Sequence, residues 1–360
     1  MNWMASPPPL RVGVLMGGRS SEREVSLASG RQVYYNLDRA RYDGRAIFMD
    51  LGGRLWLLPE KLIIQNRCAD VEARLAVEAR RLAYEDLPAE VDLVFNALHG
   101  KYGDDGCVQG LLELLDLPYT GSGVLACALS LDKPMAHALL RSVGMEAPPA
   151  EAIRAADWAR DAESCTARVV AMLLADGATR LVVLPAREGS SIGVSVVDDI
   201  EQLDAAVAEA LAFDNRVLVE AFLDGMEFSV IVTGNGDHLE AFLPTETRTE
   251  NPFMTYDDKY MPGRSQKITP AEVAPDLLAR MQAEACRAYR VLGFQGYGRM
   301  DGFLLADGRV VFTDPNSTSG MSPSSYMFHQ AAEAGLTAAA LIDRILRLAL
   351  EAHAAKRGPL

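Results

Sequence analysis

The feature that most constrains the fold of this chain is a pair of short strands near the C-terminus. Residues 298–305 and 309–316 both have the pattern of strands, and Asp307-Gly308 between them is a strong signal for a tight hairpin turn. If these two residues form the loop, the chain turns back and the strands pair as an antiparallel ladder. The register of that ladder then determines which side chains share a face.

This register brings four polar side chains together. Counting back from the turn, Asp301 faces Asp314 and Arg299 faces Asn316, all on one face of the pair. Two carboxylates directly opposite each other destabilise a ladder, so the sequence predicts a cation between them. Two carboxylates and an amide carbonyl are oxygen ligands that suit Mg²⁺ carrying nucleotide phosphates. An exposed hairpin with solvated acids is the alternative interpretation.

Size and charge restrict the class of protein. The chain has 360 residues, enough for two or three domains with ample core. Its 49% of hydrophobic and 23% of charged residues are ordinary for a globular protein. The net charge of −14 and the lack of a basic run argue against a nucleic-acid partner. They are compatible with a small substrate that arrives bound to Mg²⁺.

Cysteine usage and the start of the chain predict a compartment. The five cysteines show no CxxC spacing, which favours buried thiols in a reducing compartment. The opening residues, MNWMASPPPL, lack the basic and apolar regions of a signal peptide. No apolar run is long enough to span a bilayer. We therefore expect a cytoplasmic protein without a membrane partner, preceded by a disordered proline-rich leader.

The first third of the chain has the pattern of an α/β domain. Residues 11–16, RVGVLM, form a buried-strand run, and a helix should follow with Ser20 or Ser21 capping its start. Residues 91–98 form another apolar strand, which ends at His99. Strand, helix and strand in this order predict a parallel sheet with functional loops at the carboxyl ends of its strands.

Polar segments later in the chain give weaker signals. The glycine-serine loop at 187–193, REGSSIG, offers backbone N–H groups and hydroxyls to an anion, although an ordinary hairpin turn explains it about as well. Residues 246–268 form a polar loop that is too long for a compact domain unless it is functional. Residues 121–126 match a dinucleotide fingerprint, but the poor preceding strand favours a helix start. Lys133, at another helix start, either meets phosphates or is solvated.

Together these motifs resemble the D-alanine–D-alanine ligases of the ATP-grasp superfamily, over nearly the whole chain and in the family's order. The matching motifs include GGRSSEREVSLASG, NALHGKYGDDG, REGSSIGVS, VLVEAFLDGMEF and TYDDKY. The resemblance implies an α/β, three-domain ATP-grasp architecture with an N-terminal Rossmann-like parallel-sheet domain. The implied domains are 1–121, 122–223 as the central ATP-grasp subdomain, and 224–360 as the C-terminal metal-binding domain.

The resemblance assigns roles around two amino-acid substrates. Glu22 matches the acid that holds the ammonium of the first substrate, and His99 matches a histidine beside that substrate. Ser190 matches the serine that links Glu22 to the loop carrying Tyr260. Tyr260 is expected near the second substrate, and Ser325 near its carboxylate.

The resemblance also assigns a site for ATP. The residues implied to contact the nucleotide are Lys133, Ser191, Glu220, Leu223, Glu227 and Lys259. Of these, Glu220 and Leu223 match the adenine-side hinge. Glu227 matches the acid that binds ribose, and Lys259 matches a lysine near the γ-phosphate.

Metal ligands and an oxyanion site complete the implied chemistry. Asp301, Asp314 and Asn316 match the ligands of two Mg²⁺ ions, which Mn²⁺ can replace. Arg299 and the amide of Gly320 match the groups that stabilise a developing oxyanion. The implied enzyme phosphorylates the carboxylate of one D-alanine with ATP. The amine of a second D-alanine then attacks the acyl phosphate, giving D-alanyl-D-alanine for peptidoglycan synthesis. Members are typically homodimers.

Three positions near the phosphates depart from the family pattern. Leu184 stands where the family has a phosphate-binding lysine. The absence of that lysine weakens nucleotide binding by about 1.5–3 kcal/mol unless Arg180 or Arg187 compensates. Asp314 replaces the usual glutamate ligand and is one methylene shorter. Ser319 replaces a rigid proline beside the oxyanion amide.

Two alternatives to a D-alanine–D-alanine ligase stay open on the sequence. One is a divergent ATP-grasp ligase with another substrate pair, because Glu22 implies an α-amino group without specifying a side chain. The other is a degenerate nucleotide-binding homologue with weak activity, which Leu184 supports. The retained Arg299 and Asp301 argue against the second alternative, because a simple binding protein has little need for an oxyanion site.

Overall fold

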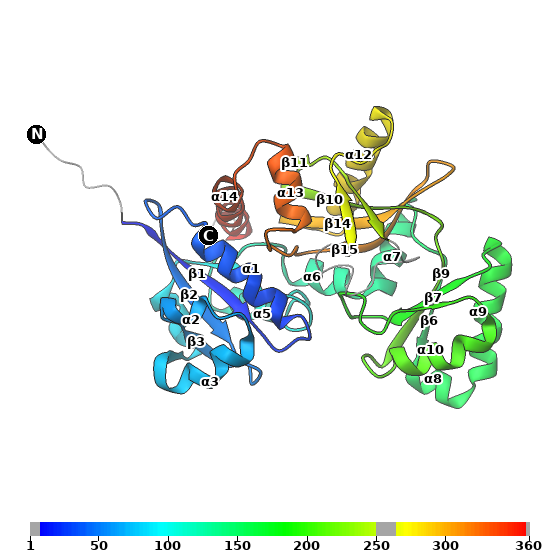
Figure 1. Ribbon diagram of the computed structural model, residues 1–360, viewed down its shortest axis with the longest axis horizontal. Helices are drawn as coiled ribbons and strands as arrows, with labels where there is room; N and C mark the ends of the chain where they lie inside the picture. The colour runs from blue at the N-terminus through cyan, green and yellow to red at the C-terminus, as the bar shows by residue number, and fades with distance from the viewer. Residues whose placement is uncertain (1–7, 250–263, 358–360) are drawn as a thin grey trace, which may run out of the picture.

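The computed structural model describes residues 8–249 and 264–357 and divides them among three β-sheets with helices around them (Figure 1). The expected proline-rich leader falls largely on residues 1–7, which lie outside the described residues. The α/β class is confirmed. The domain boundaries at residues 121 and 223 stay a prediction.

Sheet A carries the parallel strands that the N-terminal sequence predicts. Its strands are β1 (Leu10–Gly17), β2 (Tyr42–Met49), β3 (Leu55–Leu57), β4 (Arg80–Leu82) and β5 (Leu93–Asn96). Strand β1 runs parallel to β2 and β5, whereas β3 and β4 form an antiparallel edge. The helices of this region are α1 (Arg23–Tyr35), α2 (Glu60–Ile63), α3 (Cys68–Glu78), α4 (Leu87–Glu90) and α5 (Cys107–Leu114). The loops after β1 and β5 therefore leave from the same edge of the sheet, as expected for functional loops.

Two helices link sheet A to the rest of the chain. They are α6 (Val124–Leu131) and α7 (Lys133–Ser142). Gly123 is the N-cap of α6, so the glycine pattern at 121–126 is a helix start, as predicted. The side chain of Asp132 accepts a hydrogen bond from the backbone N–H of Met135 and caps α7. Lys133 is consequently held at the first turn of a capped helix.

Sheet C is antiparallel and lies at the right of Figure 1. Its strands are β6 (Ala150–Arg154), β7 (Leu181–Pro185), β8 (Ser195–Val197) and β9 (Arg216–Ala221), in the order β6-β9-β7-β8. The helices α8 (Ala155–Arg160), α9 (Ala162–Asp176) and α10 (Leu203–Ala210) complete this region, and its strands and helices share one apolar core. The predicted glycine-serine loop joins β7 to β8.

Sheet B is the largest sheet and separates a core from a polar surface. Its strands are β10 (Gly225–Asn235), β11 (His238–Ala241), β12 (Thr245–Thr249), β13 (Ser265–Ile268), β14 (Gly296–Leu305) and β15 (Val310–Asn316). The order is β13-β12-β10-β14-β15, with β11 paired to β10. The remaining helices are α12 (Pro275–Val291), α13 (Tyr326–Glu333) and α14 (Ala338–Arg357).

The two faces of sheet B differ because strand side chains alternate. One face packs on α12 through Met281, Ala285 and Tyr289, which recur every four residues along the helix. On the other face Ile231 and Tyr297 enter a core shared with sheet A, α13 and α14. On the same strands, residues that lie two or four positions from Ile231 and Tyr297 face a cavity instead.

The β14–β15 hairpin turns through a longer loop than its sequence predicts. The backbone N–H of Leu305 donates to the carbonyl of Arg309 at 2.9 Å, so the loop contains residues 306–308 rather than two residues. Gly308 occupies the left-handed region, with φ of +84°, which glycine adopts without steric cost. The predicted two-residue loop is therefore wrong by one residue.

A bulge in β15 restores the predicted register. Thr313 is the extra residue, because the pairing shifts by one position beside it. Beyond the bulge Asp301 faces Asp314, and Arg299 faces Asn316, as predicted. The longer loop and the bulge shift the ladder in opposite directions, and their effects cancel at the functional end.

The polar segment at 246–268 is shorter as a loop than the sequence indicates. Its ends form β12 and β13, which pair antiparallel with Glu246 opposite Ile268. The sequence Thr-Glu-Thr-Arg-Thr conceals this strand, because it lacks hydrophobic alternation and its buried residues are polar. Residues 250–263, between the two strands, lie outside the described residues.

Two expectations about the chain concern membranes and thiols. Over the part of the chain that the structure describes, none of the helices has the length and apolar character to cross a bilayer. All five cysteines are free thiols, and Cys68, Cys127 and Cys165 are buried as predicted. The prediction of burial is wrong for Cys107, which is exposed, and for Cys286, which is half-buried.

Candidate active site

Two neighbouring cavities lie between the three sheets. The serine-rich cavity is lined by eight serines together with Glu22, His99 and Arg299. The apolar cavity lies against sheet C and is lined by side chains such as Leu184 and Phe222. The residues that line both cavities are Lys133, Glu188, Gly189, Ser190, Glu227, Asp301 and Asp314. A molecule that extends from one cavity to the other therefore passes four acidic side chains and one lysine.

Glu22 is held at the edge of sheet A by the loop after β1. Ser20 does not cap α1 as predicted, because Glu22 occupies the N-cap position and makes no side-chain cap. Instead, the hydroxyl of Ser20 accepts a hydrogen bond from the backbone N–H of Glu22 at 3.1 Å and donates to the carbonyl of His99. This serine thus ties the loop after β1 to the loop after β5.

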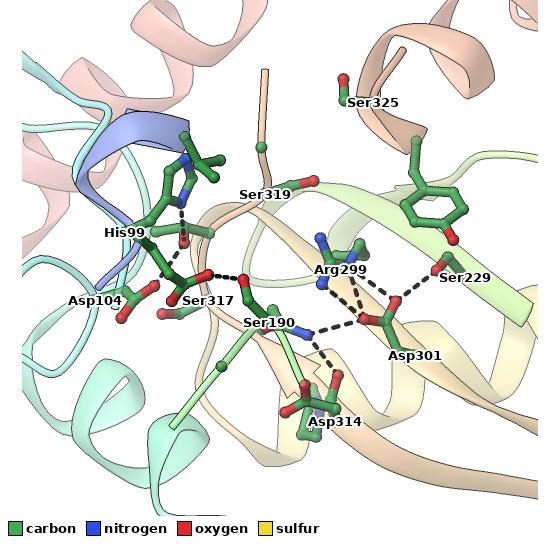
Figure 2. A pocket seen from close by; sticks show the side chains of 18 of the residues that line it. His99, Asp104, Ser190, Ser229, Arg299, Asp301, Asp314, Ser317, Ser319 and Ser325 are labelled. Carbon is green, nitrogen blue, oxygen red and sulfur yellow. Dashed lines mark hydrogen bonds and ion pairs between the residues drawn. The ribbon is translucent and has the colours of Figure 1, made fainter. Parts of the chain in front are cut away.

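His99, which is buried, and Asp104, which is half-buried, are titratable groups that line the serine-rich cavity together with Glu22 (Figure 2). Nε2 of His99 lies 3.2 Å from the hydroxyl of Ser29. Burial and the charge of Arg299 lower the pKa of His99 to about 4, so the imidazole is neutral at pH 7. Burial, followed by the charge of Glu22, raises the pKa of Asp104 to about 8.

The glycine-serine loop reaches across to Glu22. The hydroxyl of Ser190 donates a hydrogen bond to a carboxylate oxygen of Glu22, joining the loop after β7 to sheet A (Figure 2). Ser190 and Ser191 have φ of +54° and +59°, a conformation that is uncommon for residues other than glycine. At Gly189 a Cβ atom would lie 2.8 Å from Oε2 of Glu22. A side chain at residue 189 would therefore displace the Glu22 carboxylate, and the same loop holds its two serines in a strained backbone conformation.

The predicted metal ligands are held by protein groups on the cavity face of sheet B. Asp301 accepts hydrogen bonds from Arg299 at 2.8 and 2.9 Å, from Ser229 at 2.6 Å and from the amide of Asn316 at 3.1 Å. Nζ of Lys133 lies 3.2 Å from Oδ1 of Asp314. Each carboxylate therefore has its own cation, which offsets the like-charge pairing expected to need a metal.

Protein groups hold both of these cations, Lys133 and Arg299, in place. Lys133 is buried and also donates to the carbonyl of Glu188 at 2.7 Å. Burial lowers the pKa of Lys133, but the nearby charge of Asp314 outweighs this effect and the net shift is upward. The pKa of Arg299 is likewise raised, because Asp301 outweighs the effect of burial. Both side chains stay charged at neutral pH.

A buried acid, Glu220, lines the apolar cavity and lies beside a histidine that does not. Oε1 of Glu220 lies 3.4 Å from Nδ1 of His137, whose Nε2 is 2.7 Å from the carbonyl of Thr313. Burial raises the pKa of Glu220 to about 8 and lowers the pKa of His137 to about 4. The pair is therefore uncharged at pH 7, and polar atoms here add no charge to the apolar cavity.

Neither arginine that was expected to compensate for Leu184 lines the apolar cavity. Leu184 is buried in its wall. Arg187 is held by Asp214 through hydrogen bonds of 2.6 and 3.0 Å, and Arg180 pairs with Asp198. Among the described residues that line this cavity, Lys133 is the only lysine or arginine.

The structure brings most predicted site residues to the two cavities. Those that line only the serine-rich cavity are Glu22, His99, Arg299, Asn316, Gly320 and Ser325. Those that line only the apolar cavity are Ser191, Glu220 and Leu223. Lys259 and Tyr260 lie outside the described residues.

Several residues of the site were not predicted from the sequence. Asp104 follows His99 in the HGKYGDD motif, and this acid-rich spacing could have drawn attention to it. Ser229 supports Asp301 from the neighbouring strand β10, which only the sheet order reveals. Lys267 lines the serine-rich cavity from β13, a strand that the sequence pattern did not indicate.

The donor set of the predicted metal site is two carboxylates and one amide. Within residues 8–249 and 264–357, no group of three or more His, Cys, Asp and Glu side chains is arranged to hold a metal ion. The predicted set does not meet this criterion, because Asp301 and Asp314 are acids but Asn316 is an amide. Their oxygens are nevertheless the hard donors that Mg²⁺ prefers.

Comparison with known proteins relates this arrangement to one family of enzymes. The family patterns described as D-ala D-ala ligase N-terminus and C-terminus match residues 11–122 and 139–347. A D-alanine–D-alanine ligase of Streptomyces avermitilis is 35% identical, covering 96% of this chain and 95% of that protein. A D-alanine–D-alanine ligase of Cupriavidus taiwanensis is 37% identical, covering 95% and 93%.

Solved structures agree in fold over nearly the whole chain. The D-alanine-D-alanine ligase from Coxiella burnetii superposes with a TM-score of 0.82 at 27% identity, covering 97% of each chain. The VanG D-Ala:D-Ser ligase from Enterococcus faecalis gives the same TM-score and identity, covering 95% of this chain and all of that one. The ATP-grasp architecture is therefore confirmed. Matches in both halves, together with relatives of 35–37% identity over nearly the full length, show that this chain belongs to the D-ala D-ala ligase family.

Proposed function

We propose that this chain is an ATP-dependent ligase that joins two D-alanines through an acyl phosphate, giving D-alanyl-D-alanine for peptidoglycan synthesis. The observation that carries the proposal is the wall shared by the serine-rich and apolar cavities, where Lys133, Asp301 and Asp314 meet. A phosphoryl group coming from a nucleotide in the apolar cavity would meet, at this wall, a carboxylate in the serine-rich cavity. Family membership supports the same activity.

In this proposal the first D-alanine binds with its ammonium at Glu22. Ser190 orients the Glu22 carboxylate through its hydrogen bond. The neutral imidazole of His99 lines the same end of the cavity without adding charge that would repel the ammonium. Asp104, whose pKa is raised to about 8, adds a second polar group there that is largely protonated at pH 7.

Arg299 and Gly320 serve the second step of the proposed reaction. When the second amine attacks the acyl phosphate, negative charge develops on the carbonyl oxygen. Arg299 is partly buried and hydrogen-bonded to Asp301, so it is oriented before the substrate arrives. The Gly320 backbone lines the same cavity and offers an N–H group. The intermediate collapses to dipeptide and phosphate, leaving ADP.

The nucleotide and its metal are assigned to the apolar cavity and the shared wall. In this proposal Glu220, Leu223 and Glu227 contact the nucleoside of ATP, while Lys133 and Ser191 contact its phosphates. Asp301, Asp314 and Asn316 would hold Mg²⁺, which neutralises phosphate charge when bound. Lys259 and Tyr260 are proposed to approach the γ-phosphate and the second substrate.

We also propose that the protein is a cytoplasmic homodimer. Leu114 on α5 and Leu125 on α6 are 88% and 72% exposed, and such apolar side chains favour contact with a second copy. Free cysteines and ATP as a substrate are typical of the cytoplasm. Light scattering of the purified protein tests the dimer, since a monomer at micromolar concentration would contradict it.

The proposed activity is tested by coupling phosphate release to product identity. Purified protein is incubated with ATP and Mg²⁺, with or without D-alanine, and the products are analysed by mass spectrometry. We expect phosphate release that depends on D-alanine and matches the amount of D-alanyl-D-alanine. Release without dipeptide, or no release while ATP still raises the melting temperature, would contradict the proposal. EDTA should abolish the reaction, and excess Mg²⁺ should restore it.

A further inference from the structure

Lys267 lines the serine-rich cavity but has no role in the proposed chemistry. It lies on the edge strand β13 and pairs across the ladder with Thr247. Thr247 in turn faces Glu227, so all three side chains project from the cavity face of sheet B. Lys267 is partly buried there, although a lysine on an edge strand can usually extend into solvent.

The partners of Lys267 do not neutralise its charge. Nζ donates to the carbonyl of Ser324 at 2.7 Å and lies 4.6 Å from the centre of the Tyr326 ring. The guanidinium carbon of Arg299 lies 5.8 Å from the centre of the same ring, so two cations lie against one aromatic side chain. Burial, followed by repulsion from Arg299, lowers the pKa of Lys267 to about 8.

Lys267 differs in this respect from the other two cations of the serine-rich cavity. Lys133 pairs with Asp314, and Arg299 pairs with Asp301. Over residues 8–249 and 264–357, no carboxylate forms an ion pair with Lys267, which bonds a backbone carbonyl instead. Because a desolvated charge without a counter-ion is costly, an anionic group of a bound molecule is its natural partner.

The position of Lys267 selects among the anions that the proposed reaction brings to the site. Lys267 does not line the apolar cavity, so nucleotide phosphates are poorly placed to reach it. The carboxylate of the first substrate is the group that reacts beside Arg299. The carboxylate of the second substrate is not consumed. The hydrogen bond to the carbonyl of Ser324 holds Lys267 one residue from Ser325. Figure 2 shows Ser325 on the side of the cavity away from His99.

We propose that Lys267 binds the carboxylate of the second amino acid and makes a free carboxylate a condition for a good acceptor. The proposal rests on the proposed ligase function and deepens it, because it adds a specificity-determining residue. The free acid of the acceptor becomes the C-terminus of the product. An acceptor without that charge leaves the ammonium of Lys267 uncompensated and is therefore disfavoured.

Competition between two acceptors tests this role. D-alaninamide has an amine but no carboxylate that ATP can phosphorylate, so it can act only as the second substrate. A fixed mixture of D-alanine and D-alaninamide gives D-alanyl-D-alanine and D-alanyl-D-alaninamide, whose ratio is measured by mass spectrometry. Both products share ATP and the first substrate. A general loss of activity therefore leaves the ratio unchanged.

Lys267→Met should shift this ratio toward the amide by about tenfold or more, the effect of losing one charge-assisted contact. Lys267→Arg, which keeps the charge, should stay close to wild type. Lys61→Met is the matched control, because Lys61 is exposed and pairs with Glu78 on sheet A's side of the molecule. Lys267→Gln gives a second measurement if the methionine variant is unstable.

The outcomes separate the two proposals. Formation of both products with the same ratio in wild type, Lys267→Met and Lys267→Gln would overturn the role of Lys267 and leave the ligase intact. Wild-type protein that forms neither product would instead contradict the proposed function. A shift in Lys267→Met and Lys267→Gln without a shift in Lys267→Arg or Lys61→Met is the expected result.

Discussion

The serine-rich and apolar cavities share a wall but differ sharply in charge. The described lining of the serine-rich cavity includes three cations, Lys133, Lys267 and Arg299. The described lining of the apolar cavity includes one, Lys133, and Leu184 stands where the family resemblance implies a lysine. On the proposed assignment of ligands, the described residues therefore place more cations around the amino acids than around the nucleotide. We infer that, among the described residues, Lys133 makes the main cationic contribution to nucleotide binding.

The strongest test of the serine-rich cavity is the removal of Arg299. Arg299→Met should lower kcat by about 10²–10³-fold, the usual effect of losing an oxyanion-stabilising donor. The KM for ATP should change much less, because Arg299 does not line the apolar cavity. Steady-state kinetics measure both constants. Arg344→Gln, which removes an arginine paired with exposed Glu240, is the control. A loss confined to KM would contradict the assignment.

The next largest effect tests the cation that both cavities share. Lys133→Met removes a buried ammonium that contacts Asp314 and Glu188, and ATP affinity should fall by about 10–100-fold. Unlike Arg299→Met, this change should raise the KM for ATP as well as lower kcat. Calorimetric titration with ATP measures the affinity, with Lys133→Arg as the matched variant. Unchanged affinity would show that the apolar cavity does not depend on this lysine.

The same contrast explains which parts of the site could be predicted. Asp301 and Asp314 were paired correctly although the loop was wrong, because the bulge at Thr313 compensated for the extra loop residue. Their pairing follows from alternation along two strongly patterned strands. Glu22 and Ser190 were linked only through the family resemblance, since no local pattern relates residues so far apart in the sequence.

Other features depend on contacts that sequence periodicity does not encode. Ser20 has the residue type of a helix cap, yet it bonds His99 instead, because the loop after β5 is its nearer partner. Strand β12 has a threonine-rich sequence in which polar residues are buried, so it resembles a loop. Lys267 was not predicted at all, since its importance depends on the sheet that surrounds it.

Placing a lysine at residue 184 tests whether the low positive charge of the apolar cavity limits ATP binding. Leu184→Lys should raise ATP affinity by about tenfold, corresponding to one additional charge-assisted contact. Leu184 lies in the cavity wall on β7, two pairs along the ladder from Val182 and Glu220. A lysine there would also stabilise ionised Glu220, lowering its raised pKa. Leu184→Met controls for side-chain length, and equal affinity in both variants would contradict the prediction.

A pH dependence of stability should arise from the serine-rich cavity. The pKa of Asp104 is about 8 in the folded protein and close to its model-compound value of 3.8 when unfolded. Between these values the unfolded chain loses a proton that the folded chain keeps, so this group lowers stability as pH rises from about 4 to about 8. Asp104→Asn lacks the titration. The melting temperature of Asp104→Asn minus that of wild type should therefore be about 3 °C or more higher at pH 8 than at pH 5. A constant difference would contradict the shifted pKa.

The smallest expected effect concerns Arg180, one of the two arginines that could replace the positive charge missing at Leu184. Arg180 stacks on Phe222, which lines the apolar cavity, with its guanidinium carbon 4.2 Å from the ring centre, but its charge pairs with exposed Asp198. Exposed ion pairs contribute little, and this guanidinium is directed at a partner outside the cavity. Arg180→Gln should therefore change ATP affinity by less than about twofold, both alone and combined with Leu184→Lys. A tenfold loss in the single variant, rescued by the lysine, would mean that Arg180 turns toward the phosphates when ATP binds. The apolar cavity would then hold two cations in its working state, and its contrast with the serine-rich cavity would be a property of the free protein only.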